Sequence, residues 1–281
     1  MPNKIKIVTD STADLPEDFI KKHEITVVPL HVNFPEKTYL DGVDIHPHEF
    51  YNLLEKSEEI LPKTSTPSVN DFLKTYQNLL QEGYEILSVH ISSGLSSTAS
   101  MAEKAASMLN GKIHVFDSKS ISLGIGLQVL TALEMVKNNF SFETIIEKLN
   151  ETRRRTEVFF SLDTLHYLEK GGRIGKVSAL LGTILKIKPI IRVVDGIYVP
   201  LDKARNQKQA VSKIYDNMVK ILGERIPGHI AVAHGAAEDA AKTLCKMLEE
   251  KYEQKIDLFS ETGPVIGVHT GPGAIGVAFT Y

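Results

Sequence analysis

Residues 86–120 read ILSVHISSGLSSTASMAEKAASMLNGKIHVFDSKS, and their pattern indicates the class of fold. Residues 86–91 form a short apolar run rich in β-branched side chains. Residues 96–109 have the apolar spacing of a helix, and residues 112–116 form a second strand-like run. A strand, a helix and a second strand in succession pack as a right-handed crossover, which makes the two strands parallel. This segment therefore predicts an α/β fold.

The same alternation extends in both directions through the first half of the chain. Further strand and helix patterns cover residues 4–9, 25–34, 47–56, 68–81, 121–138 and 141–156. The helix at 68–81 opens with Ser68 and Asp71, which have the spacing of a capping box. Since parallel strands need helices on both faces, residues 1–156 are predicted to form an α/β domain with three layers around a parallel sheet.

The second half of the chain has a different pattern. Asp195-Gly196 separates two strand-like runs and is the strongest hairpin signal in the sequence. The remaining strand and helix patterns cover residues 158–162, 164–185, 188–194, 197–199, 207–222, 230–233, 238–251, 256–259 and 274–280. A hairpin beside crossover helices implies a mixed sheet. Residues 157–281 are therefore predicted to form a second, two-layer α/β domain, with the boundary near residues 155–157.

Composition excludes several classes of protein. Lys and Arg number 32 and Asp and Glu number 35, so no basic excess favours nucleic acid as the ligand. The single cysteine, Cys245, excludes a disulfide framework and a multi-cysteine zinc site. The first residues resemble a strand rather than a signal peptide, and no run of 18 apolar residues is present. These features favour a soluble, cytoplasmic protein.

Most familiar catalytic motifs are missing from the sequence. It has no G-x-S-x-G, Walker A or H-E-x-x-H motif. Gly124-Ile125-Gly126 lies within a helix pattern and indicates close helix packing. His46-Pro47-His48 has no acidic or cysteine cluster beside it, so we expect no metal and no cofactor. Four aspartates have the spacing of caps and turn residues, namely Asp10, Asp14, Asp41 and Asp44.

Hydroxyl-rich turns remain as the unusual feature. Residues 64–68, 92–98 and 117–120 are rich in Ser and Thr and lie between strand and helix patterns. Turns at the carboxyl ends of parallel strands lie together at the edge where open α/β folds bind ligands. Hydroxyls and free backbone N–H groups at helix starts bind anions. These turns therefore predict an anion site, although Ser and Thr are also ordinary helix caps.

Two glycine-rich segments carry further candidates. His269 lies between Gly263 and Gly276 and could donate to an anion from the second domain, or be a structural loop histidine. Residues 171–175, GGRIG, could cradle a phosphate, or simply link the end of one helix to the start of the next.

Taken in order, these motifs resemble those of the DegV family of bacterial lipid-binding proteins, and the resemblance runs through the whole chain. The segments that carry it are residues 9–15 (TDSTADL), 64–68 (TSTPS), 91–98 (ISSGLSST), 162–174 (LDTLHYLEKGGRI) and 263–273 (GPVIGVHTGPG). The resemblance implies two α/β domains with a long-chain fatty acid held between them.

The resemblance also implies a function. Relatives act as the fatty-acid-binding subunit of a bacterial fatty acid kinase, and present the carboxylate to a separate ATP-dependent kinase. Such a protein is a carrier rather than an enzyme, and its membrane contact is only transient. Carried over residue by residue, the carboxylate contacts are Thr64, Ser96, His269 and Arg205, with Ser65 and Ser97 as adjacent candidates.

Two departures from the family pattern stand out. Ser97 replaces a glycine that many relatives have, which bears on the head-group contacts. Asn206-Gln207 replaces a more basic stretch after Arg205, which bears on docking of the partner.

Two other functions are compatible with the residues. One is a hydrolase with Ser96 as nucleophile and His269 as base, for which Glu261 is the nearby acid in the sequence. The other is a binding module for a different small anion, such as a sugar phosphate. If a fatty acid is bound, apolar residues of 177–185 and 187–194 could line its slot, or form ordinary core.

Overall fold

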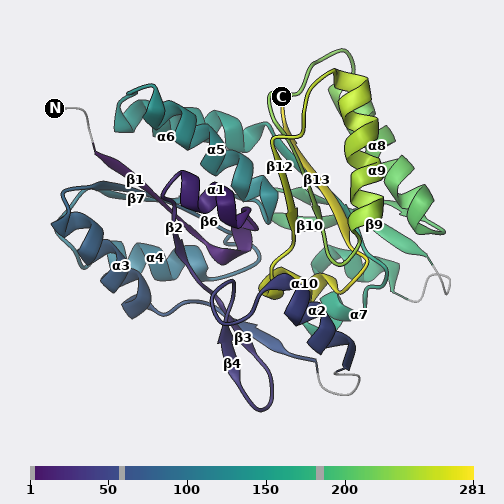
Figure 1. Cartoon of the computed structure of the whole chain (residues 1–281), viewed down its shortest axis with the longest axis horizontal. Helices are drawn as coiled ribbons and strands as arrows, with labels where there is room; N and C mark the ends of the chain where they lie inside the picture. Colours follow the sequence, from purple (N-terminus) through teal and green to yellow (C-terminus); the bar gives the residue numbers. More distant parts are fainter. Residues whose placement is uncertain (1–3, 57–60, 182–186) are drawn as a thin grey trace.

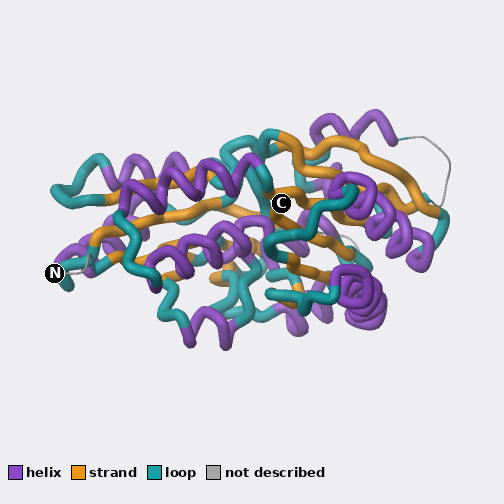
Figure 2. Tube along the Cα trace, turned by 90° about the horizontal axis from the view of Figure 1, so that it is seen from above, coloured by secondary structure: helices purple, strands orange, loops and turns teal. Residues whose placement is uncertain are grey.

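The computed structural model describes residues 4–56, 61–181 and 187–281. Two sheets lie beside each other along the long axis of the molecule (Figure 1), with helices on both sides of the strands (Figure 2). One sheet is parallel and the other is mixed, so the predicted α/β fold with a parallel and a mixed sheet is confirmed.

The N-terminal part contains a parallel sheet of strand order β2-β1-β6-β7. Its strands are β1 (Ile5–Asp10), β2 (Thr26–Val28), β6 (Glu85–His90) and β7 (Ile113–Asp117). Its helices are α1 (Glu17–Lys22), α2 (Pro47–Lys56), α3 (Val69–Gln81), α4 (Thr98–Ala106), α5 (Leu123–Lys137) and α6 (Phe142–Arg154), and Ser11–Ala13 form a 3₁₀ turn.

Adjacent residues of β1 show how the layers form. Val8 packs with Phe72 and Tyr76 of α3 on one face of the sheet. Ile7 faces the other way and packs in the cluster that contains α5. Because successive side chains of a strand point to opposite faces, both faces are apolar and both are covered by helices. This is the predicted three-layer arrangement.

Residues 25–34, predicted as one strand, form two. Pro29 has no N–H to donate to a ladder, and the chain leaves the parallel sheet there. β3 (His31–Asn33) instead joins a small antiparallel sheet with β4 (Thr38–Leu40) and β5 (Lys63–Ser65). The expectation that residues 64–68 follow a strand of the parallel sheet was therefore wrong, because Thr64 lies in β5 of the antiparallel sheet and pairs with Val32. Residues 66–68 still lead from a strand into a helix, as predicted.

The C-terminal part contains a mixed sheet of strand order β10-β9-β8-β13-β11-β12. Its strands are β8 (Thr156–Ser161), β9 (Lys188–Val194), β10 (Ile197–Ala204), β11 (Ile230–His234), β12 (Leu258–Glu261) and β13 (Ile275–Thr280). Its helices are α7 (His166–Lys170), α8 (Gln207–Leu222), α9 (Glu238–Tyr252) and α10 (Pro264–Thr270), with a 3₁₀ segment at Gly175–Leu180. β9 and β10 form the hairpin predicted at Asp195-Gly196.

Helix α5 is shared by the two parts. One face of the mixed sheet packs on α8 and α9, while Val158, Phe160 and Ala278 on the other face join the core that contains α5. A Cβ on Gly124 would lie 2.4 Å from Cγ2 of Val158, so only a glycine permits this approach of helix and strand. The close helix packing predicted for Gly124 is confirmed.

The glycine-rich segment between Gly263 and Gly276 contains a helix. α10 starts with Pro264, whose missing N–H costs nothing in the first turn of a helix. Tyr51 from α2 hydrogen-bonds Thr262 at 2.6 Å, just before this helix. Figure 1 shows α10 beside α2 and α7, so His269 is carried to the N-terminal part. No helix in the described ranges is long and apolar enough to cross a membrane.

Candidate functional site

A small cavity of about 30 Å³, lined by both polar and apolar residues, lies where the two parts meet and is called the junction cavity below. Its lining residues come from β5, β10, α10, the loop after α7, and the segments that join β1 to α1, β2 to β3, β6 to α4 and β7 to α5: Thr12, Leu30, Thr64, Ile91, Leu95, Ser96, Ile121, Arg173, Tyr198, Val265, Ile266, His269 and Thr270. Three of the predicted contacts, Thr64, Ser96 and His269, are thus brought together from positions far apart in the chain.

Thr64 and His269 join the two parts directly. Thr64 Oγ1 lies 2.9 Å from Nε2 of His269. Burial, and then the positive charge of Arg173, lower the pKa of His269 to about 4. The imidazole is therefore neutral at pH 7 and carries one proton. When that proton is on Nε2, it is donated to Thr64, and the threonine hydroxyl can donate in turn to an anion in the cavity.

The other ring nitrogen of His269 faces the backbone. Nδ1 is buried and has no hydrogen-bond partner among the described residues. A Cβ on Gly171 would lie 2.2 Å from Nδ1, which is closer than any real contact. Only a glycine at residue 171 therefore leaves room for the ring in this position.

Ser96 lies in the loop before α4. Its Oγ is 2.9 Å from Oγ1 of Thr98 and accepts a hydrogen bond from the Thr98 backbone N–H at 3.3 Å. Ser97, next to it, is exposed and makes no side-chain cap contact with α4. Ser65 is also exposed and accepts a hydrogen bond from Asn33 at 3.3 Å. Neither Ser65 nor Ser97 lines the junction cavity.

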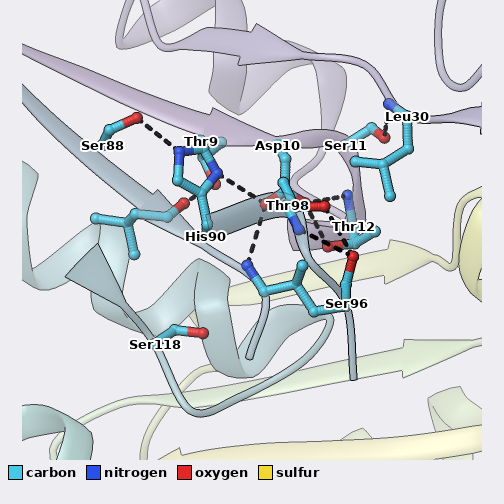
Figure 3. A network of polar contacts seen from close by, with 12 residues as sticks. Thr9, Asp10, Ser11, Thr12, Leu30, Ser88, His90, Ser96, Thr98 and Ser118 are labelled. Carbon is cyan, nitrogen blue, oxygen red and sulfur yellow. Dashed lines mark hydrogen bonds and ion pairs between the residues drawn. The ribbon is translucent and has the colours of Figure 1, made fainter. Parts of the chain in front are cut away.

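A buried network supports the wall of the cavity (Figure 3). Asp10 accepts hydrogen bonds from the backbone N–H of Thr12 and of Ile91, both at 3.0 Å, and these two residues line the cavity. His90 Nδ1 lies 2.9 Å from the same carboxylate, and Nε2 lies 2.7 Å from Ser88 Oγ. Ser88, His90 and Asp10 are fully buried, so this Ser-His-Asp row cannot reach a substrate. Its role is to hold the loops.

Arg205 lies away from the junction cavity. It follows the last residue of β10, whereas Tyr198, which lines the cavity, is near the first. Because an extended strand rises about 3.3 Å per residue, the segment from 198 to 205 spans roughly 20 Å. Arg205 is exposed, and its backbone N–H donates to Gln209 at 2.6 Å. The arginine that lines the cavity is Arg173.

The arrangement needed by a hydrolase is not formed. The ring of His269 bonds Thr64, while Ser96 bonds Thr98, so the proposed nucleophile and base are not paired. Glu261 accepts a hydrogen bond from the backbone N–H of Ala236 at 3.3 Å. With Nδ1 of His269 unpartnered within the described residues, no acid orients the ring.

An apolar cavity of about 40 Å³ adjoins the junction cavity. It lies between α5 and the mixed sheet, and Val158, Phe160 and Ala278 are among its lining residues. Ile121, Ile266 and Thr270 line both cavities, so the two are adjacent. Val177, Ile191 and Val193, from the segments predicted to line an acyl slot, are buried in the same core without lining this cavity, and residues 182–186 lie outside the described ranges.

Two aspartates predicted as turn residues are buried at the start of α10. Asp14 accepts hydrogen bonds from the Gly263 backbone N–H at 2.8 Å and from Ser122 at 2.5 Å, and burial raises its pKa well above the usual range. Asp41 is hydrogen-bonded by Ser11 and the Val265 backbone N–H, and burial raises its pKa to about 7. The sequence interpretation of these two residues was incomplete, because burial depends on α10.

Metal ligands are not assembled in the part of the chain that the structure describes, where no group of three or more His, Cys, Asp or Glu side chains could hold an ion. His48 lies instead 3.3 Å from the Asn52 amide.

Comparison with known proteins identifies the family. The sequence model described as "Uncharacterised protein, DegV family" matches residues 4–281. The chain belongs to the DegV family. It is similar to a DegV domain-containing protein of Clostridium acetobutylicum, with 41% identity over 278 residues and 98% of each chain covered. It is also similar to the protein DegV of Bacillus subtilis, with 36% identity over 279 residues and 99% of each chain covered.

Solved structures of DegV proteins have the same fold. A fatty-acid-binding DegV family protein from Thermus thermophilus aligns with a TM-score of 0.90 and 36% identity, covering 99% of this chain and 100% of that one. DegV of Bacillus subtilis, described as a fatty acid binding protein, aligns at 0.90 with 35% identity and covers 99% of each chain. A stearic-acid-binding protein from Eubacterium ventriosum aligns at 0.91 with 29% identity and covers 98% of each.

Sequence reasoning missed one charged residue of this DegV site. Arg173 stands in the GGRIG segment, which was considered as a phosphate cradle or a linker and as part of a family motif, without a role for the arginine itself. Its position after the two glycines was the available signal, since glycines permit close approach of backbone to a ligand. Its place beside His269 depends on the packing of α7 against α10, which local sequence does not reveal.

Proposed function

We propose that this DegV protein binds a long-chain fatty acid, with the carboxylate in the junction cavity and the acyl chain in the adjoining apolar cavity. The observation that carries the proposal is that the two cavities are adjacent, with Ile121, Ile266 and Thr270 lining both. The fatty acids named for the solved relatives support it.

The proposed head-group contacts are hydroxyls and one histidine. Thr64 and Ser96 supply neutral donors, and His269 orients the threonine hydroxyl. Arg173 lines the cavity and offers a charged donor, so we propose it in place of Arg205. These side chains bind a carboxylate by donating hydrogen bonds, and none of them acts as a base that would react with it. The predicted roles of Ser65, Ser97 and Arg205 stay predictions that this geometry does not favour.

Binding of the tail requires the apolar cavity to open. Cavities of about 30 and 40 Å³ are far smaller than the roughly 300–1,000 Å³ typical of ligand pockets. Each methylene that is buried contributes roughly 0.8 kcal/mol, so about ten of them supply on the order of 8 kcal/mol toward moving the walls. The walls that would separate are α5 and α10 on one side and β8 and β13 on the other.

We also propose that the bound carboxylate is presented, in the cytoplasm, to a separate ATP-dependent kinase, and that the protein carries the resulting acyl phosphate. The sequence has no Walker A motif of its own. Residues 1–156 and 157–281 are the two proposed domains, with the ligand between them. Membrane contact in this scheme is limited to loading and release of the lipid.

The test is extraction of the purified protein followed by lipid mass spectrometry, with a palmitate titration of delipidated protein. One long-chain fatty acid per chain is the expected result. A lipid-free protein that also fails to bind added palmitate would contradict the proposal. Release of product from acyl esters without a partner would instead favour the hydrolase.

A further inference from the structure

A separate cleft lies at the start of α10 and is called the acidic cleft. Its volume is about 480 Å³, within the range of roughly 300–1,000 Å³ that is typical of sites for small molecules. Its walls come from the end of β1, α1, β2, residues 41–47, β12 and the first residues of α10, so both parts of the protein contribute. None of its described lining residues also lines the junction cavity or the apolar cavity. A ligand in this cleft would therefore be additional to the proposed fatty acid.

The acidic cleft has an excess of carboxyl groups. Asp14, Asp41 and Glu261 line it, and none of the three forms an ion pair in the part of the chain that the structure describes. Lys21 is the one lysine or arginine among the described lining residues, and it pairs with Glu17 on the same helix. Carboxylates around one concavity repel one another, and a bound cation would offset that repulsion.

Two of these carboxyl groups flank a single glycine. The position of a Cβ on Gly263 would lie 3.2 Å from Oδ1 of Asp14 and 3.1 Å from Oδ1 of Asp41. The two side chains are 6% and 3% exposed. Burial is the largest cause of the raised pKa of each, and the charge of Asp10 raises both pKa values further. A cation beside the pair would favour the ionised form of both carboxyl groups.

One oxygen of this pair has no partner. Oδ2 of Asp41 is buried and has no hydrogen-bond partner among the described residues, although buried polar groups are nearly always paired. Gly42, the next residue, also lines the cleft, and a Cβ on it would meet no atom within 4 Å. The cleft therefore has open space next to Asp41, in which a ligand could place a hydrogen-bond donor.

The size and the lining of the cleft indicate which kind of cation it suits. A metal ion is disfavoured, because no group of three or more His, Cys, Asp or Glu side chains could hold one among the described residues. A single ion would also fill little of the volume. Leu15, Ile20 and Phe259 line the cleft and offer apolar surface to a chain of methylene groups. Glu261, which is only partly buried, supplies a further carboxylate from β12.

We propose that the acidic cleft binds an aliphatic diamine or polyamine. One ammonium group donates hydrogen bonds to Asp14 and Asp41, and so provides the partner that Oδ2 of Asp41 lacks. The methylene chain packs on Ile20 and Phe259, and a second ammonium group pairs with Glu261. This site is independent of the proposed fatty acid site, because the two share no lining residue.

The test is titration calorimetry at pH 8 with putrescine and spermidine, using the parent, Asp41→Asn and Glu261→Gln. Asp44→Asn is the matched control, because it makes the same change of charge three residues from Asp41 at an exposed position that does not line the cleft. n-Butylamine has the chain length of putrescine with a single ammonium group, so it tests the contact with Glu261. Magnesium chloride tests for a general cation site, and thermal melts show that each variant is folded.

We expect one spermidine to bind per chain. Asp41→Asn and Glu261→Gln should each weaken diamine and polyamine binding about tenfold, since each removes a charged partner of an ammonium group. The control should stay within about twofold of the parent. In the parent, n-butylamine should bind about tenfold more weakly than putrescine, whereas in Glu261→Gln the two amines should bind alike.

Three results would overturn the inference. The first is that neither putrescine nor spermidine binds the parent. The second is that Glu261→Gln and a folded Asp41→Asn both keep the parent's affinity; if Asp41→Asn does not fold, unchanged affinity in Glu261→Gln is sufficient. The third is that Mg²⁺ displaces spermidine at equal concentration, which would make the cleft a general cation site.

Discussion

Thr64 and His269 illustrate how single residues create the site. Their side chains meet at 2.9 Å although they are 205 positions apart. Local patterns pointed to the hydroxyl-rich turns and to His269 among glycines, and the family resemblance singled out Thr64 and Ser96 within those turns. The sequence could not assign Arg173 to the cavity or show that Asp14 and Asp41 are buried, because both facts depend on contacts with α10.

Removal of the hydroxyls is predicted to weaken head-group binding without unfolding the protein. Thr64→Ala and Ser96→Ala should each lower palmitate affinity about 10- to 100-fold, since each loses a donor to a charged group. His269→Ala should be non-additive with Thr64→Ala, because the two side chains share a hydrogen bond. Ser65→Ala is the control, as Ser65 is an exposed neighbour that lines neither cavity. Titration calorimetry with thermal melts checks this, and parent-like affinity in all variants would place the carboxylate elsewhere.

Gly171 is predicted to be irreplaceable for a steric reason. Its backbone φ is −74°, which any residue adopts, so Gly171→Ala tests the space beside the residue, where His269 Nδ1 would lie 2.2 Å and the Tyr167 carbonyl oxygen 3.0 Å from the new Cβ. The added methyl should displace the ring and lower palmitate affinity about tenfold, with little change in melting temperature. In a His269→Ala background the same substitution should have almost no further effect. Equal losses in both backgrounds would show that Gly171 acts by some route other than this ring.

At the level of elements, the sequence predicted helices correctly where the apolar spacing and the capping residues lie within the helix itself. Pro47–Lys56 and Gln207–Leu222 form helices with the predicted bounds, and Ser68 and Asp71 form the predicted capping box. The break at Pro29 was missed because residues 25–34 are uniformly rich in β-forming side chains. α10 was missed because its glycines suggest a loop, whereas carboxyl groups from the N-terminal part bind the N–H groups at its start.

Burial of Asp41 is predicted to make stability depend on pH. Its folded pKa of about 7 exceeds an unfolded value near 3.9, so the unfolded state releases the proton first as pH rises. The stability contributed by the protonated carboxyl is therefore lost between about pH 4 and pH 7. The raised pKa of Asp14 acts in the same direction.

Asp41→Asn removes the titration of residue 41 but keeps an acceptor for Val265. At pH 8 its melting temperature should exceed that of the parent by about 5 °C, and the difference should shrink toward pH 5. Differential scanning calorimetry at both values measures it, with Asp44→Asn as the exposed control. A difference that is the same at both pH values would show that Asp41 does not titrate as described.

At the level of the whole molecule, the hairpin signal at Asp195-Gly196 was enough to predict a mixed sheet. Strand order was not predictable, since β13 lies between β8 and β11 although it follows both in the chain. The sequence also did not reveal that α5 packs against both sheets, because the apolar residues of a helix do not show which sheets it will contact.

The shared core predicts that the protein unfolds as one unit. Val158 and Ala278 pack in the same cluster as Ile7 and Leu87, so each sheet has one face in the core that contains α5. We expect a single calorimetric transition and a single urea transition by fluorescence and circular dichroism. Palmitate should raise the midpoint of the whole transition, because it binds only the folded state. Two resolved transitions, with only one moved by palmitate, would contradict this.

The position of β13 has a consequence for synthesis on the ribosome. This strand is the last in the chain, yet it fills the middle of the six-stranded sheet, and α10 with His269 precedes it by only a few residues. A nascent chain thus carries Thr64 and Ser96 long before it can complete the cavity. Under the proposed function, a fatty acid can be bound only after α10 has been synthesised, and products that stop before α10 should not bind it.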